Sequence, residues 1–385
     1  MALLYSTTFS APSNIAVVKY WGKRDAGVLN LPLNPSLSVT MDQVREKRFL
    51  SLSIPNFQHT FNQAELRAVT TISALKKSDT FNKDRLWLNG EELSVDKSQR
   101  VKTVLREMRK RATRFSDAIV HIISANSFPT AAGLASSAAG YAALTIALAD
   151  VFAVPLNADL TTVARMGSGS ACRSLYGGLV AWNAGKKADG TDSVAVKIAP
   201  RSSWLDITIL VLNDEKKHTS STSGMVRSVD TSDLLGFRAK HVVSPRIEEM
   251  SKAYKSQNFE TFGTLMMRDS NQFHATCLDT YPPVFYLTDD SRKVINFVHT
   301  ANEEAGRIRA AYTFDAGPNA VIFTQSKDTE SFLNDLQKHF QQQKYQGVIK
   351  NVLNTRIGDG PRKMDKLSLI DSATLMPKKN YSSLI

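Results

Sequence analysis

One stretch, residues 118–150, constrains the fold more than any other part of the sequence. Residues 118–123 form an apolar run typical of a buried strand. Residues 128–137 are small, punctuated by glycine and free of charge, and the alanine-rich residues 138–149 predict a buried helix. The predicted order is therefore strand, tight loop, helix. Such a loop directs backbone N–H groups and the positive end of the helix at one point, so we expect an anion to bind there.

The hydroxyls of Ser136 and Ser137 lie where this helix should begin. They either cap the helix or contact a phosphate or the water shell of a magnesium ion. The loop contains neither a G-x-x-x-x-G-K-[ST] nor a G-x-G-x-x-G motif. Composition alone leaves a second interpretation open, in which the loop is only a turn before a closely packed helix.

Two other segments carry candidate chemistry. In residues 167–173 (Gly-Ser-Gly-Ser-Ala-Cys-Arg), glycines and hydroxyls precede an arginine. If a helix begins at Ser170, then Ser170 and Arg173 share a face and form a second anion site; the alternative is a flexible loop with a surface arginine. In residues 314–319 (Phe-Asp-Ala-Gly-Pro-Asn), Asp315 lies on a tight turn between two predicted strands, where it is either an active acid or a turn cap.

Four strings resemble the GHMP kinase superfamily and, more narrowly, its mevalonate diphosphate decarboxylase family. They are Asn14-Ile-Ala-Val-Val-Lys-Tyr-Trp-Gly-Lys-Arg-Asp25, Pro129-Thr-Ala-Ala-Gly-Leu-Ala-Ser-Ser-Ala-Ala-Gly-Tyr-Ala142, Gly167-Ser-Gly-Ser-Ala-Cys-Arg-Ser174 and Phe314-Asp-Ala-Gly-Pro-Asn-Ala320. All four occur in the family's order and together span most of the chain.

The resemblance implies an α+β fold of the GHMP kinase type. The N-terminal domain should be similar to the second domain of ribosomal protein S5 and should carry the ATP phosphate loop, and the C-terminal domain should be ferredoxin-like. Because the composition changes near residues 190–205, we place the domains at 1–195 and 196–385. The active site should lie in the cleft between them.

The resemblance also implies an activity of the mevalonate pathway of isoprenoid and sterol biosynthesis. The expected reaction is the ATP-dependent decarboxylation of (R)-5-diphosphomevalonate to isopentenyl diphosphate, with ATP and Mg²⁺. By position, the catalytic residues are Asp315, which takes the proton of the substrate hydroxyl, Arg173, which reads the carboxylate, and Lys23, near the reacting end or the diphosphate.

Further positions follow from the same resemblance. The expected substrate contacts are Tyr20, Lys23, Ser168, Ser170, Arg173, Ser220 and Ser221. The expected ATP contacts are Lys19, Ser124, Asn126, Gly133, Ser136 and Ser137. Magnesium is implied by the nucleotide, and no ligand motif identifies its site.

Charge and cysteine content bear on partners and compartment. The net charge of +12 suits an anionic partner, either nucleic acid or a small polyphosphate. Two cysteines, Cys172 and Cys277, cannot form a disulfide framework and fit a reducing compartment. No secretory signal or apolar run of membrane-spanning length is recognisable. We therefore expect a cytoplasmic protein, a homodimer, with small-molecule partners and neither nucleic acid nor membrane.

The rest of the chain alternates between predicted strands and helices. Strands are expected at 5–19, 34–39, 49–61, 177–182, 204–212, 312–314 and 320–324, and helices at 159–166, 244–254, 259–269, 287–304 and 329–343. Asn89-Gly90 between two apolar runs predicts a hairpin over residues 86–95. Residues 216–224, dense in lysine and hydroxyl groups, are expected to form a loop, which either is only solvated or closes on phosphates from the second domain.

Other functions stay open. Residues 101–115 predict an amphipathic helix with six basic residues on its outer face: Lys102, Arg106, Arg109, Lys110, Arg111 and Arg114. This helix is either a solvated face or a nucleic-acid contact, although no aromatic residues interleave with the basic ones. The nearer alternatives are a kinase that stops at the 3-phosphate, a decarboxylase of the monophosphate, and a catalytically silent relative.

Overall fold

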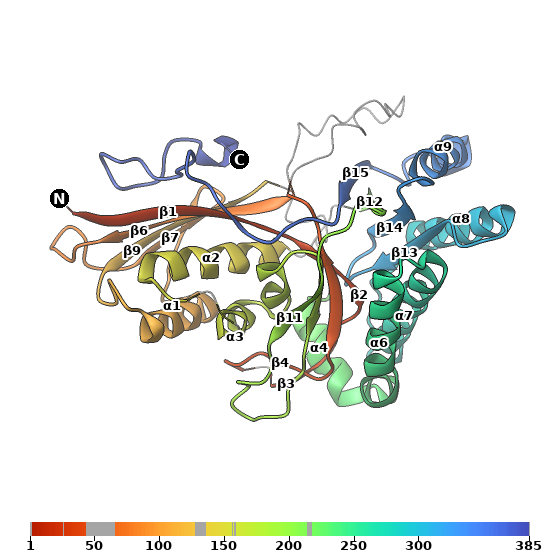
Figure 1. Ribbon diagram of the computed structural model, residues 1–385, viewed down its shortest axis with the longest axis horizontal. Helices are drawn as coiled ribbons and strands as arrows, with labels where there is room; N and C mark the ends of the chain where they lie inside the picture. The colour runs from red at the N-terminus through yellow and green to blue at the C-terminus, as the bar shows by residue number, and fades with distance from the viewer. Residues whose placement is uncertain are drawn as a thin grey trace.

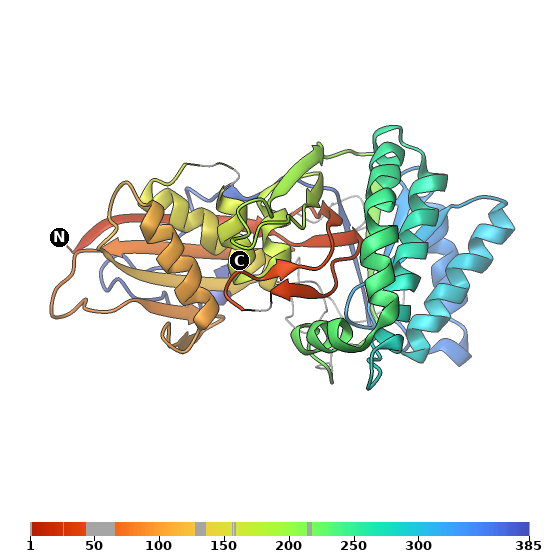
Figure 2. The ribbon, with the colours of Figure 1, turned by 90° about the horizontal axis from the view of Figure 1, so that it is seen from below.

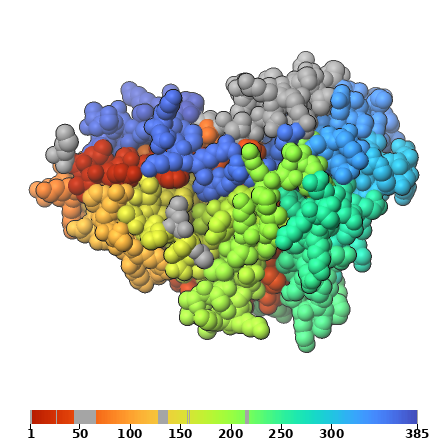
Figure 3. Space-filling model, in the orientation of Figure 1, coloured from red at the N-terminus to blue at the C-terminus, as the bar shows by residue number. Residues whose placement is uncertain are grey.

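The computed structural model describes residues 2–25, 27–43, 66–127, 136–155, 157, 159–213 and 218–384. The strand predicted at 49–61 lies outside these residues. In Figure 1 the N-terminal half, built on one long sheet, lies beside a C-terminal group of helices and strands, and Figure 3 shows the two as adjoining lobes. None of the helices in the described part of the chain is long and apolar enough to cross a membrane.

The N-terminal half contains a six-stranded sheet in the order β16-β1-β6-β9-β7-β8. Its strands are β1 (Leu3–Pro12), β6 (Arg67–Leu75), β7 (Arg85–Leu88), β8 (Glu91–Leu93), β9 (Ile119–Asn126) and β16 (Arg362–Lys363). The predicted β7–β8 hairpin is confirmed, with positive φ at Asn89 (51°) and Gly90 (98°) as a primed turn requires.

Helices cover one face of this sheet and the C-terminal segment covers the other (Figure 1). The helices are α1 (Gln99–Arg111), α2 (Ser136–Phe152) and α3 (Asp159–Gly167). Alanines 138, 139, 142, 143 and 147 of α2 are fully buried, which lets the helix approach β1 and β6 closely. On the opposite face, Leu369, Ile370, Leu375 and Tyr381 pack on β6, β7 and β9.

The predicted helix over 101–115 ends earlier, at Arg111. Ala112 is extended, and the Arg114 guanidinium donates to the carbonyls of Asp150 (2.5 Å) and Val151 (2.9 Å) at the end of α2. These contacts hold residues 112–115 against α2 instead of continuing α1. Arg109 pairs with Asp84 at 2.8 Å, and Lys110 and Arg111 pair with Glu107 at 2.9 and 3.0 Å. The ion pairs neutralise much of the basic face within the molecule, which favours the solvated-face interpretation.

A second, four-stranded sheet connects the two halves. Its order is β11-β10-β5-β2, formed by β2 (Asn14–Val18), β5 (Ser36–Thr40), β10 (Leu179–Trp182) and β11 (Ala195–Ala199). A two-stranded ribbon, β3 (Lys23–Asp25) with β4 (Leu31–Pro32), lies after β2. Between α3 and β10, the 3₁₀ helix η2 (Gly169–Leu175) contains both Ser170 and Arg173 and begins one residue before the expected start at Ser170.

The C-terminal half has an antiparallel sheet in the order β13-β14-β12-β15. Its strands are β12 (Leu205–Val211), β13 (Ala310–Phe314), β14 (Ala320–Gln325) and β15 (Asn351–Arg356). The helices are α4 (Ser221–Thr231), α5 (Asp233–Phe237), the π-helical η3 (Arg238–Val242), α6 (Val243–Lys255), α7 (Phe259–Asp279), α8 (Asp289–Ala305) and α9 (Thr329–Phe340). The long helices α6 and α7 stand side by side in Figure 2. Short 3₁₀ turns η4 (Gln343–Tyr345) and η5 (Tyr381–Leu384) complete the described chain.

Three further local predictions differ from the structure. Residues 221–224 are the first turn of α4 rather than a loop, because Ser220 caps the helix by accepting from the Ser223 N–H at 3.1 Å. Helix α7 continues ten residues beyond the predicted end at Asp269, and α9 ends at Phe340 instead of Gln343. The division at 195/196 stays a prediction, although β16 and the segment after it return to the N-terminal sheet.

Candidate active site

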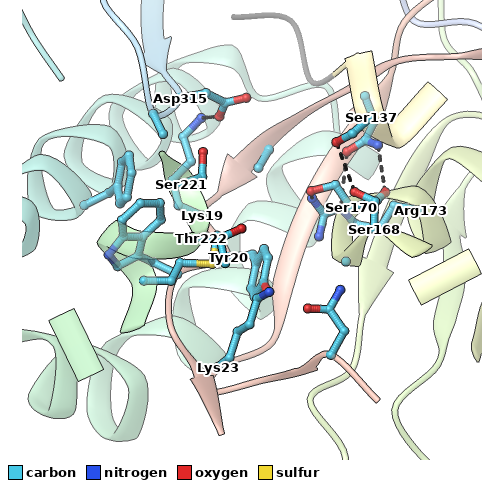
Figure 4. Close-up of a pocket in the computed structure, with 18 of the residues that line it drawn as sticks. Lys19, Tyr20, Lys23, Ser137, Ser168, Ser170, Arg173, Ser221, Thr222 and Asp315 are labelled. Atoms are coloured by element: carbon cyan, nitrogen blue, oxygen red, sulfur yellow. Dashed lines mark hydrogen bonds and ion pairs between the residues drawn. The ribbon is translucent and has the colours of Figure 1, made fainter. Parts of the chain in front are cut away.

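A cavity of about 340 Å³ lies where the two halves meet. Nine of the residues predicted from the sequence line it: Lys19, Tyr20, Lys23, Ser137, Ser168, Ser170, Arg173, Ser221 and Asp315. Figure 4 shows Lys19, Ser221 and Asp315 on one side, facing Ser137, Ser168, Ser170 and Arg173 on the other. Segments separated by up to about three hundred residues therefore form one site.

The Lys19–Asp315 ion pair forms one wall of the cavity. The Lys19 ammonium donates to Asp315 Oδ1 at 2.6 Å, with 3% of the lysine and 29% of the aspartate side chain exposed. Burial lowers the pKa of Lys19, and the neighbouring Asp315 carboxylate partly opposes that shift. Since Oδ1 is occupied by the lysine, Oδ2 is the carboxylate oxygen left for a ligand hydroxyl.

Arg173 forms the opposite wall and is held by neutral oxygens. Its Nε donates to Ser38 Oγ (3.0 Å) and Asn14 Oδ1 (3.3 Å). Its Nη1 donates to Ser36 Oγ at 2.6 Å and its Nη2 to Ser170 Oγ at 3.3 Å. Among the described residues, no carboxylate pairs with this buried guanidinium, and burial lowers its pKa. One N–H on each terminal nitrogen remains for a ligand, and a guanidinium can bind a carboxylate through two such groups.

Hydroxyl groups line the space between these walls. The Oγ atoms of Ser137, in the first turn of α2, and Ser168 are 3.2 Å apart and share a hydrogen bond. The phenolic oxygen of Tyr20 is buried with no partner in the described structure, and burial raises the pKa of this phenol. The Tyr20 ring packs on Trp182 with centroids 4.7 Å apart. A buried, unpaired hydroxyl at a cavity wall is an available hydrogen-bonding group for a ligand.

A third, basic wall is formed by Lys23 and Arg100 with the start of α4. Lys23 is the first residue of β3, and burial and the nearby Arg100 lower its pKa. Arg100, in the first turn of α1, donates to Thr222 Oγ1 at 3.3 Å across the cleft. Ser221 and Thr222 lie in the first turn of α4, where backbone N–H groups and the helix dipole favour an anion.

The cavity carries a strong positive charge. Lys19, Lys23, Arg100 and Arg173 contribute four positive charges among the described lining residues, against the single carboxylate of Asp315. The formal excess of three suits a ligand with several negative charges.

The remaining predicted residues are not among the described residues that line the cavity. Ser124 Oγ bonds Thr70 Oγ1 at 2.9 Å within the sheet, and Asn126 N–H donates to Asn89 Oδ1 at 2.9 Å. Ser220 caps α4 and is not among the described lining residues. Gly133 lies outside the described residues, and Ser136 is the first residue of α2. Their assignments to ATP or substrate stay predictions, as does the assignment of Lys19 to ATP.

Sequence reasoning missed several lining residues, including Asn14, Trp21, Arg100, Thr222, Met225 and Phe273. Asn14 and Trp21 belong to a string already singled out, and their proximity to Lys19 was the available signal. Arg100 had no such signal, because it is an ordinary residue of a helix start. Thr222 belongs to residues 216–224, already singled out for their hydroxyl groups, but only the fold brings it to Arg100.

Comparisons with known proteins match this arrangement over nearly the whole chain. A family model described as diphosphomevalonate decarboxylase-like N-terminal domain matches residues 11–195, and one described as mevalonate 5-diphosphate decarboxylase C-terminal domain matches residues 207–353. Diphosphomevalonate decarboxylase of Rattus norvegicus is 49% identical over 86% of this chain and 80% of the rat protein. The chain belongs to the diphosphomevalonate decarboxylase family.

Solved structures of the diphosphomevalonate decarboxylase family share its fold. A crystal structure of mevalonate 5-diphosphate decarboxylase superposes with a TM-score of 0.83 and 39% identity, covering 97% of this chain and 100% of that chain. MDDEF in complex with MVAPP, AMPPCP and magnesium gives a TM-score of 0.74 and 31% identity, covering 93% of this chain and 98% of that chain. These similarities confirm the predicted α+β fold of the GHMP kinase type.

Proposed function

We propose that the protein catalyses the ATP-dependent decarboxylation of (R)-5-diphosphomevalonate to isopentenyl diphosphate, with release of ADP, phosphate and CO₂. Family membership supports the reaction. The observation that carries the proposal for this chain is one cavity with the Lys19–Asp315 pair on one wall and, on the other, Arg173, which pairs with none of the described carboxylates. A substrate with a carboxylate, a hydroxyl and a diphosphate has a complementary group for each wall.

Asp315 would act on the substrate hydroxyl. Its Oδ2 accepts the hydroxyl proton while the hydroxyl oxygen bonds to the γ-phosphorus of ATP and the bond from that phosphorus to ADP breaks. A carboxylate is a far weaker base than an alkoxide, so the proton moves late, as the new P–O bond forms. The Lys19 ammonium, 2.6 Å from Oδ1, fixes the carboxylate and stabilises negative charge at this wall.

Arg173 would hold the substrate carboxylate for the second step. The C3–O bond breaks and phosphate leaves with its electron pair, while the bond to the carboxylate carbon supplies the electrons of the new C=C bond and CO₂ departs. The two remaining N–H groups of Arg173 orient the substrate carboxylate, and the hydroxyls of Ser36, Ser38 and Ser170 orient the guanidinium.

The diphosphate would bind at the basic wall. Lys23, Arg100 and the N-terminal turn of α4 offer two cations, the Ser221 and Thr222 hydroxyls and a helix N-terminus. Tyr20, with its unpaired buried hydroxyl, completes this region.

ATP would approach from the α2 side. Helix α2 begins at Ser136, and Ser137 lines the cavity, so the first turn of α2 meets the site where the γ-phosphate must arrive. The related structure with AMPPCP and magnesium supports a magnesium–nucleotide complex. The described residues contain no group of three or more His, Cys, Asp or Glu side chains that could hold a metal, so we assign the ion no protein ligand.

We further propose that the protein is a cytoplasmic homodimer.

Product analysis tests the proposal against its nearest alternatives. The protein is incubated with ATP and either 5-diphosphomevalonate or 5-phosphomevalonate, and the products are identified by mass spectrometry. We expect isopentenyl diphosphate from the diphosphate and little turnover of the monophosphate. Accumulation of a 3-phosphate would indicate a kinase, and preferential decarboxylation of the monophosphate would indicate the other sibling activity.

A further inference from the structure

Side chains bind the main chain of Lys19, and two of them, Asp269 and Arg238, belong to the C-terminal half. Strand β2 ends at Val18, and its pairing with β5 is already irregular between Ala16 and Val18. The Lys19 N–H donates to Asp269 Oδ2 at 2.7 Å instead of to a strand. The Lys19 carbonyl accepts from Asn34 Nδ2 at 3.1 Å and from Arg238 Nη2 at 3.4 Å. Both peptide groups of the catalytic-site lysine are therefore bound by side chains.

Asp269 is the centre of a buried charged cluster. It lies on α7 with no exposed surface, and the equally buried Arg238 donates from Nη2 to its Oδ2 at 2.9 Å, with Oδ1 of the same carboxylate 2.8 Å from that nitrogen. Arg246, on α6, donates to Asp269 Oδ1 at 2.9 Å. Both arginines also reach Gln272 Oε1, at 2.6 and 3.0 Å. Three elements of the C-terminal half thus meet at one carboxylate that also binds Lys19.

The backbone that presents Arg238 is unusual. Residues Arg238–Val242 form a π-helical segment between α5 and α6, and such segments are frequent at functional sites. The Nε of Arg238 is buried without a partner in the described structure. Two buried cations around one carboxylate, with one donor unsatisfied, are a poor way to stabilise a core, where apolar side chains would serve better. The arrangement calls for another role.

We propose that Asp269 is a positioning residue, which together with Arg238 and Arg246 fixes the main chain of Lys19 and thereby places the Lys19 ammonium on Asp315. This inference rests on the proposed function. A displacement of the Lys19–Asp315 pair by about 1 Å would misalign Asp315 Oδ2 with the substrate hydroxyl, which lowers the rate on the order of 100-fold. Neither arginine needs to contact substrate for this effect.

The cluster also sets the electrostatics at Lys19. The charged or titratable groups around its ammonium are Asp315, Asp269, Arg173 and His274, with Arg238 on its carbonyl. Burial lowers the pKa of Lys19, and the Asp269 carboxylate is one of the groups that oppose this shift. Loss of that negative charge lowers the pKa of Lys19 further, so the ammonium gives up its proton at lower pH.

Three variants test the inference after the wild type has been shown to release CO₂ with ATP, so that failure of the proposed function is seen separately. Asp269→Asn keeps an acceptor for the Lys19 N–H and removes the charge. Arg238→Lys keeps the charge but cannot reach Asp269, Gln272 and the Lys19 carbonyl together. Arg356→Lys is the matched control, because Arg356 pairs with the buried Asp206 at 2.9 Å in the same half, away from the cavity.

We expect kcat to fall about 100-fold in Asp269→Asn and about 10-fold in Arg238→Lys, with KM for the substrate changed less than threefold. The alkaline limb of the rate profile should move to lower pH in Asp269→Asn. Arg356→Lys should lose about as much thermal stability as Arg238→Lys and keep kcat within twofold of the wild type. Wild-type kcat in folded Arg238→Lys, an unmoved alkaline limb in folded Asp269→Asn, or an equal kcat loss in the control would each overturn the inference. If Asp269→Asn does not fold, the inference is judged by whether kcat of Arg238→Lys is lower than kcat of Arg356→Lys.

Discussion

Replacement of Arg173 by lysine tests the carboxylate contact most sharply, because it keeps the charge and removes the planar fork. Four hydrogen bonds use Nε, one N–H of Nη1 and one of Nη2, so two of the five guanidinium N–H groups remain. They lie on different terminal nitrogens, from which an end-on bidentate contact with a carboxylate is made. A lysine ammonium, bound by the same serine hydroxyls, offers the substrate at most one donor in a fixed direction.

The expected loss in kcat/KM follows from the number of hydrogen-bond donors that the substrate carboxylate loses. One hydrogen bond to a charged group contributes about 1.5–3 kcal/mol. Its removal from the transition state corresponds to a decrease of about 10- to 150-fold in kcat/KM. Because Ser36 and Ser38 also lose their shared partner in a buried site, the upper part of this range is expected.

Two assays separate this contact from a general disturbance. Steady-state kcat/KM measures the catalytic loss, and equilibrium binding compares 5-diphosphomevalonate with isopentenyl diphosphate, which has no carboxylate. Arg173→Lys should weaken binding of the first about tenfold or more and leave the second within twofold. Equal weakening of both ligands, or kcat/KM within about threefold of the wild type, would refute the role of Arg173 in reading the carboxylate.

Three further predictions follow. Asp315→Ala should reduce turnover on the order of 10³-fold or more while ATP binding, followed by calorimetry, stays within a few-fold; near-normal turnover would contradict the role of Asp315. Arg100→Met should raise KM for the diphosphate substrate about tenfold and reduce the preference, in kcat/KM, for the diphosphate over the monophosphate. An unchanged preference would show that Arg100 does not bind the diphosphate. Burial lowers the pKa of His274 to about 3, so the folded protein keeps this imidazole neutral while the unfolded chain takes up a proton below about 6.5. The free energy of unfolding should therefore fall as the pH drops. Between pH 7.5 and 5, measured by urea titration, this fall should be about 2 kcal/mol smaller in His274→Asn than in the wild type. An identical pH dependence of the two proteins would contradict this.

The residues that could be predicted are those whose local sequence carries the signal. The strand and the alanine-rich helix were readable because burial on a sheet demands that composition, while the small-residue loop between them lies outside the described residues. Ser170 and Arg173 were placed on one face because three-residue spacing in a helix brings them together, and they are hydrogen-bonded. Asp315 and Lys19 were each identified, but their ion pair spans 296 positions and depends on the fold.

The residues that could not be predicted owe their role to tertiary contacts. Arg100 and Thr222 meet only because α1 and α4 approach across the cleft. The start of α4 was missed because a serine- and threonine-rich run is typical of loops as well as of helix caps. Asp269 had no signal at all, since an aspartate in a helix of ordinary composition gives no indication that it binds a strand end 250 positions away.

The central claim is tested most directly by CO₂ release from carboxyl-labelled 5-diphosphomevalonate, measured with and without ATP while ADP is followed in the same tube. The proposed function predicts no release without ATP and equal amounts of CO₂ and ADP with it. ADP without CO₂ would show a kinase that stops at the 3-phosphate, and neither product would contradict the assignment of this substrate.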